Sequence, residues 1–147
     1  MFKETSKELL DFLSKSPTAF HAVENYRQIL NADGFKELLE SEHWDIVPGG
    51  KYYVTRNNTS ILAFKVGTKL DNYSFNIVTS HTDSPTFKVK ENAEIEVKNK
   101  YTQLNTEGYG GMLCATWLDR PLSIAGRVLV SEGNSIVTKL LNIDRDL

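Results

Sequence analysis

The chain has 147 residues, a length typical of one ordinary domain that buries a core without needing disulfides. Hydrophobic residues make up 40% and charged residues 24%, the balance of a soluble globular protein. The net charge is −2, whereas nucleic-acid-binding proteins normally have an excess of basic residues, so we expect no nucleic-acid partner. No apolar run reaches the roughly 20 residues of a membrane span, and no signal-peptide core is present. We therefore expect no membrane partner. A single cysteine, Cys114, excludes an internal disulfide, so we expect a protein of the reducing cytoplasm.

The first part of the chain has a helical pattern. Apolar residues recur at helix spacing over residues 9–13 and again over residues 19–30. Pro17 separates the two runs, because proline restricts the residue before it and suits the start of a helix. Gly34 supplies a C-cap, so two helices are predicted, followed by a short amphipathic stretch over residues 35–44.

The remaining part of the chain predicts strands. Five stretches are β-branched or alternate between apolar and polar residues: 51–56, 60–66, 94–97, 127–130 and 135–141. The first two flank Asn57-Asn58 and the last two flank Gly133-Asn134, which predicts two hairpins. Residues 75–80 predict a further strand, and their apolar, β-branched character suits a buried sheet.

The sharpest chemical feature is the segment Ser80 to Pro85, directly after that last predicted strand. In open α/β sheets, binding groups gather at the carboxyl ends of strands. His81 and Asp83 point to the same side of an extended segment, and a neutral imidazole is a common metal ligand. Asp83 can fix the tautomer of that imidazole, bind the metal itself or orient a bridging water. Because His-X-Asp arises often by chance, a hydrogen-bonded loop histidine is the alternative.

Other conspicuous side chains have structural explanations. His21 lies on the apolar face of the second predicted helix, which favours a buried, hydrogen-bonded histidine. His43 is expected on the surface, Cys114 as a small buried hydrophobe and Trp117 in the core. The glycines after Tyr109 permit a close backbone approach but match no phosphate-binding fingerprint.

Three groups of motifs follow one another along the chain: FL at 12–13 with SPTAFHAV at 16–23; SHTDSP at 80–85 with FKVK at 87–90; and YGG at 109–111 with TWLDR at 116–120 and AGRV at 125–128. Taken together and in this order, they resemble the M18 family of aminopeptidases, the group that includes aspartyl aminopeptidase. The resemblance covers nearly the whole chain.

This resemblance implies an α/β fold class, namely a zinc-exopeptidase catalytic domain interrupted by a β-rich oligomerisation domain. Residues 1–90 would be the N-terminal part of the catalytic domain, and residues 91–147 the incomplete start of the inserted β-rich assembly domain. The resemblance also implies that His81 is a zinc ligand. Asp83 would belong to the catalytic centre, where it supports that histidine.

The implied function is that of a cytoplasmic, homo-oligomeric metallo-aminopeptidase that releases the N-terminal residue of peptides. Two zinc ions per active site would hold a water, and a glutamate would move its proton. The family's adjacent Glu-Glu pair does not occur in this sequence. We therefore expect a truncated, N-terminal portion that is inactive alone and binds zinc weakly. The alternative is an inert, shortened homologue that acts as an assembly or interaction module.

Overall fold

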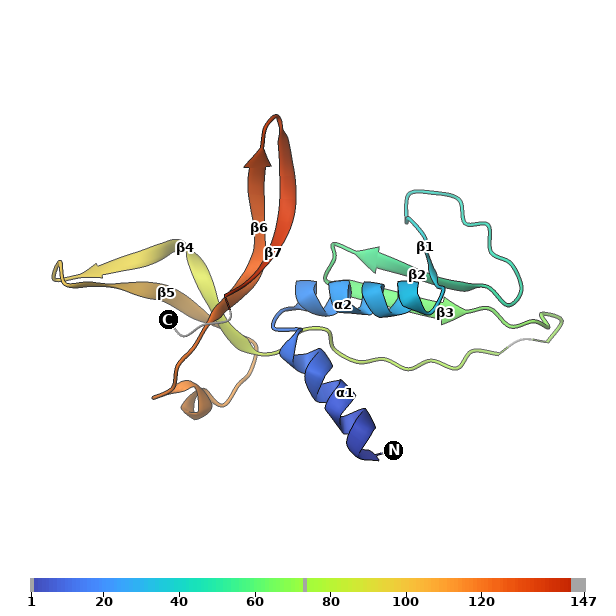
Figure 1. The fold of residues 1–147 in the computed structure, drawn as a ribbon, viewed down its shortest axis with the longest axis horizontal. Coiled ribbons are helices and arrows are strands. Elements are labelled where there is room, and N and C mark those ends of the chain that lie inside the picture. Colours follow the sequence, from blue (N-terminus) through green and yellow to red (C-terminus); the bar gives the residue numbers. More distant parts are fainter. Residues whose placement is uncertain (1, 73, 144–147) are drawn as a thin grey trace. The chain divides into compact units, whose positions relative to one another are not determined.

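The computed structural model describes residues 2–72 and 74–143 (Figure 1). The chain forms two compact units, one of Met1–Asp83 with Ser123–Leu147 and the other of Ser84–Leu122. Neither helix in the described part of the chain is long and apolar enough to cross a membrane.

Two helices open the first unit, α1 over Phe2–Ser14 and α2 over Ala19–Ala32. Thr18 is the N-cap of α2, where its Oγ1 accepts a hydrogen bond from the backbone N–H of His21 at 3.4 Å. Gly34 follows α2 with a φ of +80°, a left-handed conformation that glycine adopts without steric cost. Both predicted helices are confirmed.

A three-stranded sheet with the order β1-β2-β3 follows the helices (Figure 1). Strand β1 (Lys36–Glu37) pairs in parallel with β2 (Lys51–Arg56), and β2 pairs antiparallel with β3 (Ser60–Lys65). Asn57 and Asn58 have φ angles of 53° and 55°, and a hairpin turn of this kind matches the twist of its strands. The predicted hairpin is confirmed, whereas the amphipathic stretch over residues 35–44 contributes only the short strand β1.

The core of the first unit lies between α2 and the sheet. Among the described residues, the buried apolar ones are Ala22 and Val23 of α2 and Tyr52 and Tyr53 of β2. Tyr53 is only 1% exposed, and its hydroxyl donates a hydrogen bond to Asn31 Oδ1 at 3.0 Å. The hydroxyl thereby ties β2 to the last turn of α2.

A second hairpin belongs to the same unit. Strands β6 (Ile124–Glu132) and β7 (Ser135–Ile143) pair antiparallel around Gly133, which has a φ of +61°. The guanidinium of Arg127 lies 4.5 Å from the centre of the Phe20 ring, so the hairpin contacts the first turn of α2. The predicted hairpin is therefore confirmed, with longer strands than expected.

The second unit is built on β4 (Thr86–Val97) and β5 (Tyr101–Tyr109). These strands form an antiparallel hairpin with an irregular register between Val89 and Glu94. The short 3₁₀ helix η1 (Cys114–Trp117) brings the ring of Trp117 edge-on to Phe87 at 5.3 Å. The sequence predicted only the last four residues of β4 and missed β5.

Two predictions are wrong. Residues 75–80 form an extended segment without strand pairing, and the side chains of Ile77 and Val78 are 78% and 97% exposed. A strand needs a neighbour for its N–H and C=O groups, and the described strands all pair elsewhere. Cys114 is exposed rather than buried, because the single turn of η1 presents no buried face.

Candidate functional site

The segment that carries the His-X-Asp motif is attached to the β2–β3 hairpin of the first unit. Thr82 Oγ1 donates a hydrogen bond of 2.7 Å to the backbone carbonyl of Thr59, the residue that precedes β3. Thr82 and Asp83 are half-buried, whereas His81 is exposed. The hydrogen bond from Thr82 therefore holds the backbone between the two candidate residues.

His81 and Asp83 form a close pair, as the sequence predicted from their spacing. Nδ1 of His81 lies 3.1 Å from Oδ1 of Asp83. An ionised carboxylate only accepts hydrogen bonds, so Nδ1 carries the proton and Nε2 keeps its lone pair. The side chain of His81 is 92% exposed, which leaves Nε2 accessible. A carboxylate on one ring nitrogen with the other nitrogen accessible is a geometry that metal-binding histidines share.

The chain contains a second His-X-Asp sequence that serves as an internal comparison. His43 and Asp45 are both exposed, and their closest approach is 3.7 Å from Nε2 to Oδ1. That distance is too long for a hydrogen bond, so Asp45 does not fix the orientation of the imidazole. His43 is a surface residue, as predicted, and the spacing alone does not create the pair seen at His81.

A zinc ion needs more ligands than this pair supplies. Zinc sites in proteins have three or four protein ligands. Within residues 2–72 and 74–143, no three His, Cys, Asp or Glu side chains lie close enough together to hold a metal. His81 and Asp83 therefore supply at most two of the groups that a zinc site needs.

His21 has a structural role. Its Nδ1 lies 2.8 Å from Oγ1 of Thr18, the N-cap residue of α2. Burial lowers the pKa of His21, which favours the neutral imidazole and a hydroxyl that donates to Nδ1. The predicted hydrogen-bonded histidine is confirmed, although the residue is half-buried rather than buried.

The glycines after Tyr109 act within the second unit. Gly110 has a φ of +74°, and a Cβ built on it would lie 3.6 Å from Pro85. This is an ordinary van der Waals distance, so Gly110 is required by its positive φ rather than by a close backbone approach.

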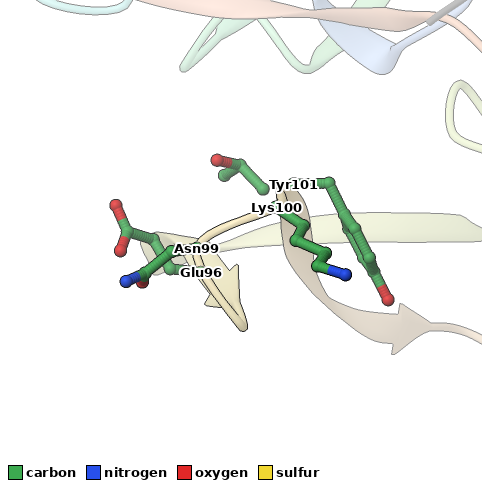
Figure 2. A pocket seen from close by; sticks show the side chains of 5 residues that line it. Glu96, Asn99, Lys100 and Tyr101 are labelled. Carbon is green, nitrogen blue, oxygen red and sulfur yellow. The ribbon is translucent and has the colours of Figure 1, made fainter.

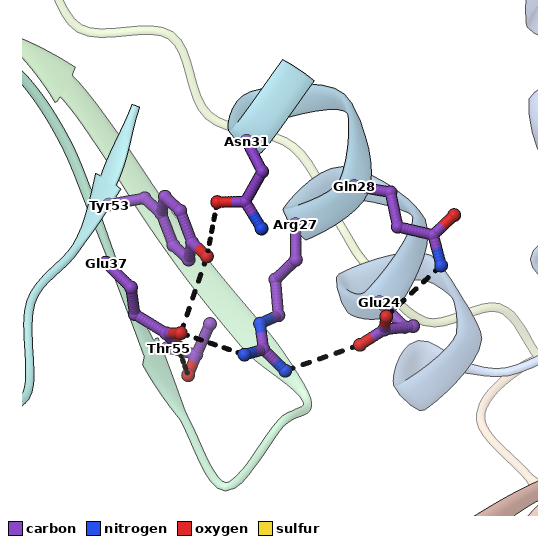
Figure 3. A network of polar contacts seen from close by, with 7 residues as sticks. All are labelled: Glu24, Arg27, Gln28, Asn31, Glu37, Tyr53 and Thr55. Carbon is purple, nitrogen blue, oxygen red and sulfur yellow. Dashed lines mark hydrogen bonds and ion pairs between the residues drawn. The ribbon is translucent and has the colours of Figure 1, made fainter. Parts of the chain in front are cut away.

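A polar network in the first unit was not predicted from the sequence (Figure 3). Nη2 of Arg27 lies 2.8 Å from Glu37 Oε2, and Nη1 lies 3.3 Å from Glu24 Oε2. A hydrogen bond with Tyr53 and the two carboxylates raises the pKa of Arg27. The only local signal is the spacing of Glu24 and Arg27 on one helix face, because Glu37 and Tyr53 arrive from the sheet.

A shallow hollow at the tip of the β4–β5 hairpin is formed by the turn itself. Figure 2 shows the side chains of Glu96 and Asn99 on one side of this turn and those of Lys100 and Tyr101 on the other. The four side chains do not converge on one point, so the turn has the features of a solvent-exposed loop.

The sequence model of the aminopeptidase I zinc metalloprotease (M18) family matches residues 12–147. The chain is 49% identical to the probable M18 family aminopeptidase 2 of Clostridium novyi, over 97% of this chain and 34% of that protein. It is 44% identical to the aspartyl aminopeptidase of Dictyostelium discoideum, over 97% of this chain and 30% of that protein. The chain therefore spans about a third of the length of these relatives.

Solved structures also match this chain over nearly its whole length. A chain in the cryo-EM structure of the Ape4 and Nbr1 complex matches with a TM-score of 0.94 and 41% identity, over 99% of this chain and 28% of that chain. The S. cerevisiae mApe1 dodecamer matches with a TM-score of 0.84 and 31% identity, over 97% of this chain and 34% of that chain. These matches confirm the predicted mixed α/β fold. The chain belongs to the M18 family of zinc aminopeptidases.

Proposed function

We propose that the whole protein is a zinc-dependent aminopeptidase that releases the N-terminal residue of peptides, and that His81 is one of its zinc ligands. Asp83 acts in the catalytic centre by supporting that histidine. The single observation that carries the proposal is the 3.1 Å contact between His81 Nδ1 and Asp83 Oδ1, which leaves Nε2 exposed. Membership of a family described as zinc metalloproteases supports the choice of zinc.

Each residue of this segment has a defined part in the proposal. Asp83 holds the proton on Nδ1, which directs the lone pair of Nε2 outward. Thr82, through its bond to Thr59, limits the movement of the backbone that carries both side chains. Zinc, when bound, supplies a polarised substrate carbonyl and an acidified water. The other ligands, a second zinc ion and the glutamate base come from other parts of the protein.

We also propose that residues 1–90 belong to the catalytic domain and residues 91–147 to a β-rich assembly domain of a cytoplasmic homo-oligomer. One solved relative is a dodecamer, which supports assembly. The β6–β7 hairpin exposes Leu129 and Ile136, and exposed apolar side chains of this kind suit a subunit contact. These same features support the alternative of an inert assembly module.

Zinc binding by the 147-residue chain separates the two functions. We would titrate zinc by calorimetry into the wild type, His81→Ala, Asp83→Asn and the matched control His43→Ala. The enzyme proposal predicts weak binding that is lost in His81→Ala, weakened in Asp83→Asn and unchanged in His43→Ala. Equal binding by the wild type and His81→Ala would contradict the proposal and favour the assembly module.

A further inference from the structure

A hollow of about 400 Å³ lies in the first unit, where α2, the β2–β3 turn and the β6–β7 hairpin meet. We call it the Arg127 hollow. Its polar lining consists of Glu24, Arg27, Asn58, Arg127 and Thr138, and its apolar lining includes Phe20. Its volume falls within the range of about 300–1,000 Å³ that is typical of small-molecule sites.

Arg127 presents hydrogen-bond donors to this hollow that the protein does not use. Its guanidinium lies over the Phe20 ring at 4.5 Å, so the ring covers one face of the planar group. The N–H donors of a guanidinium lie in its plane and stay available when its face is stacked. Among residues 2–72 and 74–143, no side chain or carbonyl forms a hydrogen bond or an ion pair with the guanidinium of Arg127, whose backbone pairs in the β6–β7 ladder. Phe20 therefore holds an open fork of donors in place.

The charges around the hollow favour an anion. Glu24 is the one carboxylate in the lining. Arg27 also lines the hollow, but its charge is balanced by Glu24 and by Glu37, whose Oε2 lies 2.8 Å from Nη2. Glu24 is already engaged, with Arg27 Nη1 at 3.3 Å and Gln28 Nε2 at 3.2 Å (Figure 3). Nε of Arg27 is buried and has no hydrogen-bond partner among the described residues. The positive charge of Arg127 is thus left without a balancing carboxylate.

Two uncharged groups complete the lining. Asn58 sits in the β2–β3 turn with a φ of 55°, and the turn places it beside the hollow. Thr138 of β7 faces Leu129, two residues beyond Arg127 on β6, so Thr138 and Arg127 share one face of the hairpin. An amide and a hydroxyl in these places can bond oxygen atoms that the guanidinium leaves free.

We propose that the Arg127 hollow binds a small oxyanion, a carboxylate or a phosphate, through paired hydrogen bonds from Arg127. A guanidinium matches two oxygens of either group, and such charge-assisted pairs are stronger than neutral hydrogen bonds. Asn58 and Thr138 bond the remaining oxygens, and the apolar lining excludes water on the other side. This proposal does not rest on the proposed peptidase function.

The test is a titration of the 147-residue chain followed by NMR amide shifts, with inorganic phosphate in one arm and malonate in the other. Sodium chloride keeps the ionic strength constant, so that general screening does not change. We expect saturable shifts in α2, the β2–β3 turn and β6–β7 with at least one of the two anions. The arm that saturates identifies the ligand as a phosphate or a carboxylate.

Substitution that preserves charge separates a specific pair from general attraction. Arg127→Lys keeps the cation but removes the fork, and we expect it to lower the affinity about tenfold. The matched control Arg120→Lys changes an exposed arginine of the second unit and should leave the affinity unchanged. Thr138→Val, an exposed position that tolerates substitution, should also weaken binding. Shifts that grow linearly with both anions, or equal affinity in Arg127→Lys and the wild type, would overturn the proposal.

Discussion

The hydroxyl of Tyr53 offers the sharpest test of how the first unit is held together. Tyr53→Phe removes the hydrogen bond of 3.0 Å to Asn31 Oδ1 and leaves the buried ring in place, so no cavity forms. A hydrogen bond of this kind contributes about 0.5–1.5 kcal/mol net. The hydroxyl also lies 3.4 Å from Glu37 Oε2, a long contact that shares the same proton, and it interacts with the Arg27 guanidinium. Asn31 is exposed and regains water, so we expect a loss of about 1 kcal/mol in unfolding free energy.

Urea denaturation followed by the fluorescence of Trp44 measures this loss. Trp44 lies in the first unit and Trp117 in the second, so a Trp117→Phe background isolates the signal of the first unit. Tyr101→Phe, at an exposed position in the second unit, is the control and should change nothing. Tyr53→Ala removes the whole ring at a cost of about 3–5 kcal/mol and should prevent folding. A Tyr53→Phe variant as stable as the wild type would refute the role given to this hydroxyl.

Four further outcomes follow from the structure and the proposed function. Gly34→Ala should cost about 1–2 kcal/mol in urea denaturation, because a Cβ there meets nothing within 4 Å and only the φ of +80° opposes it; an unchanged midpoint would refute this. Burial lowers the pKa of His21 below its unfolded value of about 6.5, so the unfolded chain binds more protons and stability should fall as the pH drops through that value. His21→Gln should make the unfolding free energy depend less on pH. An equally steep pH dependence in the variant would show that other groups cause it. The purified chain with added zinc should not hydrolyse leucine- or aspartate-anilides, and turnover above background would contradict the expected inactivity. Light scattering should show self-association through the exposed apolar side chains of β6–β7 and residues 75–80, and a monomer at all concentrations would argue against it.

The parts of the fold that were predicted correctly depend on local signals. Thr18 and Gly34 mark the two ends of α2 through caps that act within a few residues. Asn57 and Asn58 place the first hairpin, because their positive φ angles suit a tight turn. Residues 75–80 have the composition of a buried strand, but pairing and burial depend on a neighbour that lies elsewhere in the sequence. Composition could not decide whether that neighbour is present.

In the candidate site, too, only the features that depend on neighbouring residues could be predicted from the sequence. The alternation of side chains along an extended segment predicts that His81 and Asp83 lie on the same side, but this spacing alone does not predict the contact of 3.1 Å between them. The contrast with His43 and Asp45 was not visible in the sequence, because both pairs have the same spacing and only the segment of His81 is anchored by the hydrogen bond from Thr82 to a residue 23 positions away. Arg127 stacks on Phe20, a residue far away in the sequence, so the residues adjacent to either one could not predict this contact.

The proposed zinc site depends most on which nitrogen of His81 binds zinc. Long-range proton–nitrogen NMR spectra of the chain, recorded with and without zinc, report the state of both ring nitrogens separately. The structure predicts a proton on Nδ1, held by Asp83, and a zinc-dependent shift at Nε2 of His81 with none at His43. A proton on Nε2 of His81, or zinc-dependent shifts of the same size at His43 and His81, would contradict the central claim.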